Sequence, residues 1–254
     1  MNLKLKLVCL SASALLVFSC ASKQEVVYFQ DAQEFETLVD DNSFTTKFKV
    51  DDLISINVST LDPEASAPFN LFRGAEEGGI RPEQVNYLVD KNGEIDFPVI
   101  GKVKIAGLSP SETQELLTEK LKDYLKNPII NIRIRNFTVT ILGAVNRPGT
   151  YQVNGEQITI LEAIGLAGDI NIKGRRDNVM VVRDFDGTKV YNRVNLNSKQ
   201  AFKSPVYYLT QNDVIYVEPN RSGKTASNLD QRASIAVSII SVLITSTVVL
   251  LTRN

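Results

Sequence analysis

Two apolar segments lie at opposite ends of this 254-residue chain and set the limits on what it can fold into. The first runs from Leu7 to Phe18 behind two lysines, and the second, residues 233–252, contains no charged residue. Charged and polar residues recur throughout the sequence between them, so the middle of the chain is not a polytopic membrane domain. The pattern predicts one or two globular modules with short membrane-directed ends.

The composition excludes several classes of function. The chain has no His and no Trp, which rules out a histidine general base, a Ser-His-Asp triad and a His-ligated metal site. Its formal net charge is -1 and it has no long run of like charge, so we expect no nucleic-acid partner. No nucleophile, metal-ligand cluster or phosphate-binding loop is recognisable either. We therefore expect no catalytic residues, no metal, no cofactor and no enzymatic activity.

The N-terminal apolar segment has the form of a secretory signal. It is too short to span a bilayer as a helix, and it ends at Val17-Phe18-Ser19-Cys20. This ending resembles the lipobox of bacterial lipoproteins, in which the cysteine is diacylated and becomes the first residue of the mature chain. We predict lipidation at Cys20; the alternative is an ordinary secretory signal with an incidental cysteine. Ala21-Ser22 lacks the acidic residue that retains some lipoproteins in the inner membrane, which favours the outer membrane.

The C-terminal apolar segment is long enough to cross a membrane, because about twenty residues at 1.5 Å rise match the roughly 30 Å hydrocarbon core. At about 100° per residue, five of its hydroxyl side chains fall within roughly 60° of arc. These residues are Ser234, Ser238, Ser241, Thr245 and Thr252. Two interpretations stay open. The helix is a tail anchor whose hydroxyls bond to helix carbonyls or to another helix, or several copies form a barrel with the stripe facing a wet lumen or the helix seams.

Residues 48–136 predict a small module with both strands and a helix. Asn92-Gly93 supplies the positive φ angles of a tight turn, which predicts a hairpin between the strands on either side of it. Ser109 and Glu112 form a capping box that begins a helix. Residues 129–134 then alternate isoleucine with polar residues, the pattern of a half-buried strand.

Residues 137–218 predict a second module of similar size. Pro148-Gly149 fixes a turn between two strands, and a short helix near 159–167 ends at Gly168. Further strand patterns follow, and a helix lying across a small mixed sheet favours a β-grasp. A short basic cluster consists of Lys173, Arg175 and Arg176. Contact with an acidic polymer is one interpretation of this cluster, and a solvated loop is the one we prefer.

Several motifs occur in the order found in Wza-like polysaccharide export proteins. In the first module they are Tyr87-Leu-Val-Asp90, Gly93-Glu-Ile-Asp-Phe-Pro98, Ile100-Gly101-Lys-Val and Ala106-Gly107-Leu108. In the second they are Leu142-Gly143-Ala-Val-Asn-Arg-Pro148-Gly149-Thr-Tyr151, Leu161-Glu-Ala163, Ala167-Gly168 and Asn212-Asp213-Val-Ile-Tyr-Val217. The first set resembles the polysaccharide export domain of this family, and the second resembles its soluble-ligand-binding β-grasp domain.

The resemblance implies a fold class of α+β, with a small β-rich export domain followed by one β-grasp domain and a C-terminal transmembrane helix. We divide the chain into a signal peptide (1–19), a lipidated N-terminal connector (20–47), an export domain (48–136), a β-grasp domain (137–218), a linker (219–231) and the C-terminal helix (232–254). The best-known members have two β-grasp modules, so a shorter periplasmic vestibule is implied here.

The function implied is that of an outer-membrane translocon subunit for capsular or extracellular polysaccharide. By resemblance, the partners are the polymer, further copies of the chain in a ring that is octameric in the family, outer-membrane lipid and an inner-membrane polysaccharide co-polymerase or kinase. The bulk of the chain would be periplasmic, and its C-terminus would lie at the cell surface. A rival interpretation is a membrane-tethered module that binds a glycan or a protein without forming a pore.

Overall fold

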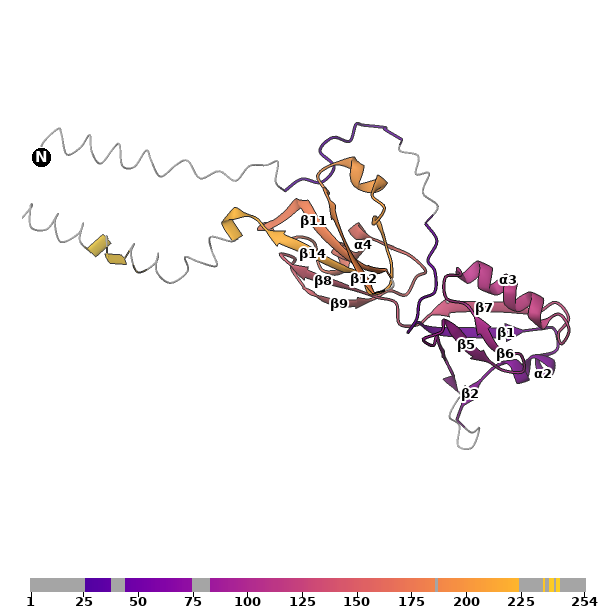
Figure 1. The fold of residues 1–254 in the computed structure, drawn as a ribbon. Coiled ribbons are helices and arrows are strands. Elements are labelled where there is room, and N and C mark those ends of the chain that lie inside the picture. Colours follow the sequence, from indigo (N-terminus) through magenta and orange to yellow (C-terminus); the bar gives the residue numbers. More distant parts are fainter. Residues whose placement is uncertain are drawn as a thin grey trace, which may run out of the picture.

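The computed structural model describes residues 26–37, 44–74, 83–185 and 187–223, together with the single positions 235, 238, 239, 241 and 242. These residues form two mixed α+β modules joined end to end (Figure 1). Each module has its own cluster of buried apolar side chains, and Ile134 packs against both clusters. The expected α+β class is therefore confirmed.

The first module contains a three-stranded antiparallel sheet in the order β4-β1-β7. Strand β1 (Leu53–Ser59) is central, between β4 (Tyr87–Leu88) and β7 (Ile129–Ile134). Helix α3 (Pro110–Leu121) packs against β7, because its buried face carries Leu117 and Leu121. The remaining elements are α2 (Pro63–Ser66), η3 (Ala67–Phe69), β2 (Phe72–Arg73), β3 (Glu83–Gln84), β5 (Glu94–Phe97) and β6 (Gly101–Lys104).

The predicted turn at Asn92-Gly93 is present and is closed by a backbone hydrogen bond from the Asp90 N–H to the Glu94 carbonyl at 2.8 Å, but the predicted pairing of the strands around it does not form. Gly93 has φ +77°, and the carboxylate of Asp90 accepts hydrogen bonds from the backbone N–H groups of Asn92 and Glu94. The strands on either side do not pair with each other, because β4 pairs with β1 and β5 pairs with β6. The turn therefore passes the chain from one sheet to another.

The capping box of α3 is confirmed. The Glu112 carboxylate accepts from the Ser109 backbone N–H at 2.7 Å, and the Ser109 hydroxyl accepts from the Glu112 N–H at 3.2 Å. Replacing Ser109 with Ala should lower the free energy of unfolding by about 1 kcal/mol, because a helix N–H loses its partner. Urea unfolding followed by circular dichroism measures this change. Ser111→Ala, at an exposed position of the same turn, is the control, and an equal loss there would contradict the capping argument.

The second module contains a five-stranded mixed sheet in the order β12-β11-β14-β8-β9. Its central strands β8 and β14 run parallel, and every other neighbouring pair is antiparallel. A helix lies across this sheet as predicted, and it begins with a second capping box between Thr159 and Glu162. The elements are β8 (Thr138–Gly143), β9 (Gly149–Gln152), β10 (Ile158–Thr159), α4 (Ile160–Leu166), β11 (Gly174–Phe185), β12 (Thr188–Val194), η4 (Lys199–Lys203), β13 (Tyr208–Leu209) and β14 (Val214–Pro219).

Residues 26–37 form a strap that lies on the second module, although they precede the first module in the sequence (Figure 1). The Phe29 ring stacks on Phe202 with their centroids 4.8 Å apart. Asp31 accepts hydrogen bonds from the Ser198 hydroxyl and the Lys199 N–H, at 2.6 and 2.7 Å. Part of the predicted connector (20–47) therefore docks on the second module before the chain reaches the first, a contact that the sequence did not indicate.

The two predicted membrane-directed ends lie almost wholly outside the described residues. This applies to residues 1–19, Cys20, Ser234, Thr245 and Thr252. Within the stripe, Ser238 and Ser241 are described and helical, and the Ser241 hydroxyl donates to the Ser238 carbonyl at 2.8 Å. In the part of the chain that the structure describes, no helix has both the length and the apolar character needed to cross a membrane.

Candidate functional site

Polar contacts accompany Ile134 where the two modules meet. The Asn136 side chain accepts from the Leu53 N–H at 2.8 Å and donates to the Asp51 carbonyl at 2.9 Å. The Lys49 ammonium donates to the Thr210 hydroxyl at 3.2 Å, across from the first module to the second. Of these hydrogen bonds, the one from Lys49 to Thr210 crosses from one module to the other, and two hollows lie beside these contacts.

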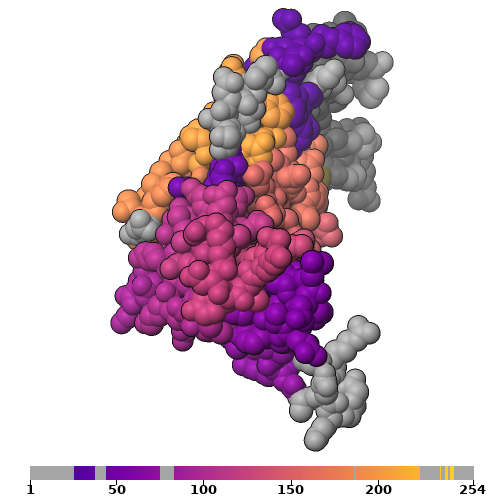
Figure 2. Space-filling model, turned by 90° about the vertical axis from the view of Figure 1, so that its right-hand side faces the viewer, coloured from indigo at the N-terminus to yellow at the C-terminus, as the bar shows by residue number. Residues whose placement is uncertain are grey.

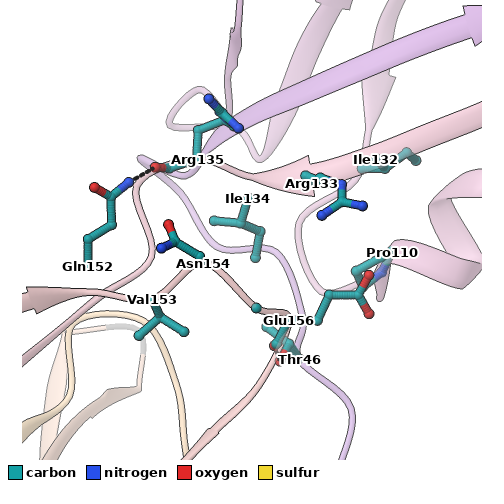
Figure 3. Close-up of a pocket in the computed structure, with 11 residues that line it drawn as sticks. Thr46, Pro110, Ile132, Arg133, Ile134, Arg135, Gln152, Val153, Asn154 and Glu156 are labelled. Carbon is teal, nitrogen blue, oxygen red and sulfur yellow. Dashed lines mark hydrogen bonds between the residues drawn. The ribbon is translucent and has the colours of Figure 1, made fainter. Parts of the chain in front are cut away.

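The smaller hollow has a volume of about 170 Å³ and lies between β7 and the loop after β9. Figure 3 shows the Gln152 amide reaching the Arg135 carbonyl, which is a hydrogen bond of 3.1 Å. Arg133 lies at the hollow from the first module, and Glu156 lies there from the second. The Thr46 hydroxyl donates to the Glu156 carbonyl at 2.7 Å. Two hydrogen bonds therefore join residues that line this hollow.

The larger hollow, which we call the junction hollow, has a volume of about 510 Å³. Polar and charged side chains surround it: Lys49, Asp51, Asp184, Lys189, Gln211 and Asn212. Asp184 forms an ion pair with Lys189 and accepts from the Gly187 N–H at 2.7 Å. The Lys189 ammonium and this N–H together lower the pKa of the Asp184 carboxyl, so it is ionised at neutral pH.

A buried ion pair supports the wall of the junction hollow. Arg183 on β11 donates two parallel hydrogen bonds to the Asp213 carboxylate, at 3.1 and 2.7 Å, and a third to the Tyr208 carbonyl at 2.8 Å. Asp213 is fully buried and also accepts from the Thr210 N–H at 2.8 Å. The pair therefore holds the turn that carries Gln211 against strand β11. The alternating pattern of β11 gives no sign that one of its buried positions is an arginine with a partner thirty residues away.

The three residues of the basic cluster lie in different environments. Arg176 is 4 % exposed, so the preferred interpretation as a solvated loop is wrong for this residue. Arg175 pairs with Asp177 at 2.8 Å, and its guanidinium lies 3.7 Å from Glu218. Lys173 is exposed. The structure therefore does not present these side chains as one free basic patch.

The strap covers the buried arginine. The Tyr28 ring lies 5.1 Å from the Arg176 guanidinium, and the Tyr28 hydroxyl donates to the carboxylate of Asp169. Burial and this carboxylate raise the pKa of the Tyr28 phenol well above its usual range. Tyr28 belongs to a short apolar run for which the sequence suggested no role, and only the fold brings it to Arg176.

The groups that gather at the joint are of a few chemical kinds. Among the described residues, no three His, Cys, Asp or Glu side chains come close enough to hold a metal ion. The predicted stripe is not assembled in the part of the chain that is described, because only Ser238 and Ser241 of its five residues belong to that part. The side chains that do gather at the junction hollow are hydrogen-bonding groups and ion pairs.

Each of the two modules matches a known domain family. Residues 41–135 match the family model described as polysaccharide biosynthesis/export protein, and residues 138–193 match the SLBB domain. A relative named EPS I polysaccharide export outer membrane protein EpsA, from Ralstonia solanacearum, is 26% identical over 147 residues, which are 56% of this chain and 38% of the relative. The protein of the same name from Ralstonia nicotianae is 30% identical over 96 residues, which are 37% of this chain and 25% of the relative.

These matches cover less than half of the length of either relative. Within this chain, however, the two matched domains follow one another, the first over the first module and the second over β8 to β12 of the second module. The resemblance inferred from the ordered motifs is confirmed. The chain belongs to the Wza-like polysaccharide export family.

Proposed function

We propose that this protein is an outer-membrane subunit of a channel that exports capsular or extracellular polysaccharide. The observation that carries the proposal is the ordered match of both modules, together with two relatives named as polysaccharide export outer membrane proteins. The polymer is then the transported substrate, and the protein is a hydrated conduit that catalyses no reaction. Deleting its gene should abolish surface polysaccharide while the polymer accumulates inside the cell.

The positions of the chain ends support an orientation for this subunit. Cys20 precedes Val26 by six residues. Since an extended chain spans at most about 3.5 Å per residue, a lipid on Cys20 lies within about 20 Å of the strap. Strand β14 ends on the side of the second module that faces away from the first module (Figure 1). The described chain therefore begins and ends at the second module, which supports an orientation with this module nearest the outer membrane and the first module toward an inner-membrane co-polymerase or kinase.

The first prediction concerns the lipid anchor. Replacing Cys20 with Ala should abolish labelling of the protein by a fatty-acid analogue, because the only other cysteine, Cys9, lies inside the signal peptide and is removed with it. The measurement is in-gel detection of the analogue in cells that produce each variant. Cys9→Ala is the matched control and should be labelled normally. Equal labelling of the Cys20 variant would end the lipoprotein proposal.

The second prediction concerns the ring. A lumen lined by one helix from each copy exists only in a closed assembly, so crosslinking in intact envelopes should give a ladder that ends at one defined size. By family resemblance we expect eight copies, each contributing residues 233–252 to a helical barrel. A strictly monomeric protein, in membranes and in mild detergent, would instead favour the tethered binding module.

The third prediction concerns the C-terminus. If residues 233–252 cross the outer membrane outward, an antibody should reach a tag placed after Asn254 on unpermeabilised cells. Deleting the segment should block export and leave the two modules folded, because each has its own core. Circular dichroism of the truncated protein checks the folding. Tag exposure only after permeabilisation would show that the segment is an anchor and that the channel lies elsewhere.

A further inference from the structure

The junction hollow opens onto the face of the five-stranded sheet opposite to α4. Successive side chains of a strand point to opposite faces. Val179 and Val181 of β11 belong to the buried core together with residues of α4. The residues that alternate with them, Met180 and Val182, therefore point to the other face. Val182 is half-buried and Leu142 on this face is 43 % exposed, so the face is open and mixes apolar side chains with the charged pair Asp184–Lys189.

One row of side chains crosses this face at the hollow. Val182 is paired with Tyr191 on one side and with Val214 on the other. Directly paired residues place their Cβ atoms about 5 Å apart on the same face, so the tyrosine ring stands beside a floor of two valines. Tyr191 is 64 % exposed, and both valines line the junction hollow. The hollow thus has an apolar floor, and Tyr191 is the strand neighbour of one of its two valines.

The rim of the hollow is polar and electrically balanced. Its two cations, Lys49 and Lys189, are matched by the two carboxylates Asp51 and Asp184. Lys189 pairs with Asp184, and Lys49 donates to the Thr210 hydroxyl. The hollow therefore offers several strong hydrogen-bonding groups but no excess of positive charge, which argues against a polyanionic ligand.

Gln211 provides a second indication that a ligand belongs in the hollow. Its side chain is only 6 % exposed, and its carbonyl oxygen has no hydrogen-bond partner among the described residues. A buried amide oxygen without a donor costs free energy, and native structures satisfy most such groups. Gln211 lines the junction hollow, so a turn of its side chain would offer this buried oxygen to a hydroxyl group bound there.

We propose that the junction hollow binds an uncharged sugar unit of the exported polymer. A pyranose ring has an apolar C–H face, suited to the valine floor and to the negative face of the Tyr191 ring, and an edge of hydroxyl groups, suited to the polar rim. The volume of about 510 Å³ is in the range of small-ligand sites. This inference rests on the proposed export function and assigns one point of contact along the polymer's path. The contact is weak, because a tightly held polymer would stall.

Saturation-transfer NMR of the full-length protein in detergent tests the site. The probe is a set of oligosaccharides prepared by partial hydrolysis of the polymer that the source cells export. Tyr191→Ala should weaken binding at least tenfold, and Gln211→Leu should weaken it without loss of folding, because leucine removes the amide that lacks a partner. Tyr124→Ala is the matched control, since Tyr124 is a tyrosine of similar exposure, 56 %, on the first module. Added salt should change the affinity by less than about twofold, as expected for an uncharged ligand.

The outcomes separate this proposal from the proposed export function. If the Tyr191 and Gln211 variants bind the oligosaccharides as the unmodified protein does, or if the unmodified protein transfers no saturation, the sugar site is overturned. A steep loss of binding with salt would also overturn it, because it would indicate a site for anions. Gene deletion tests export independently: surface polysaccharide that persists without the protein would overturn the export function, whatever the oligosaccharides do.

Discussion

Replacing Asp213 with Ala should lower the free energy of unfolding of the second module by about 3 to 5 kcal/mol, the largest effect we expect from a single substitution. The Arg183 side chain is 5 % exposed and its partner carboxylate is fully buried. Removing the carboxylate leaves a buried guanidinium charge whose one remaining acceptor among the described residues is the Tyr208 carbonyl, and it also removes the acceptor of the Thr210 N–H. Leaving a charge buried without its counterion is much more costly than losing an exposed pair.

The measurement is urea unfolding followed by circular dichroism. The matched control is Asp177→Ala, which breaks an ion pair with Arg175 in which both side chains are more than one-third exposed. That change should lower the free energy of unfolding by less than about 1 kcal/mol. Replacing Arg183 and Asp213 together with leucine should cost less than Asp213→Ala alone, because no unpaired charge is left. Equal effects of Asp213→Ala and Asp177→Ala would contradict the role assigned to the buried pair.

Asp52→Asn should stabilise the protein at pH 7 and remove part of its pH dependence. Asp52 lies at the joint, 1 % exposed, and burial raises the pKa of its carboxyl from 3.8 to about 6, against the opposing effect of the hydrogen bond from the Lys49 N–H. The folded state therefore binds more protons than the unfolded state between about pH 4 and 6. In this window the free energy of unfolding falls as pH rises. Above the pKa of Asp52 in the folded protein, the whole cost of burying its ionised carboxylate is present.

At about 1.4 kcal/mol per pKa unit, burying the ionised Asp52 carboxylate costs about 2 to 3 kcal/mol of stability, and asparagine removes this cost. Asparagine also keeps a side-chain oxygen that can accept the hydrogen bond from the Lys49 N–H. Urea unfolding at a series of pH values measures the effect. The control is Asp51→Asn, which removes a charge from the same turn at an exposed position. If the Asp52 variant is less stable than the unmodified protein at pH 7, or if its stability falls as steeply between pH 4 and 6, the buried carboxylate does not impose this cost.

The sequence by itself determined the features that depend on neighbouring residues. The capping box at Ser109, the helix that ends at Gly168 and the strand at 129–134 are all present in the structure. Their signals act within about four residues along the chain, through backbone groups that the same local segment satisfies. The order of such motifs was also enough to identify the family, because motif order needs no knowledge of three-dimensional contacts.

Only the tertiary structure decided which distant segments meet. It pairs β4 with β1 instead of β5, brings Tyr28 to Asp169 across 141 positions and buries Arg176 beneath the strap. It also assembles the junction hollow, whose floor comes from the second module and whose rim comes from both modules, and which no sequence motif indicated. A strand pattern shows which side chains are buried but not which strand lies beside it, because pairing depends on long-range packing and on satisfying every buried polar group. Whether a charged side chain can be buried depends in the same way on an oppositely charged partner that only the fold brings near, as Arg183 and Asp213 show.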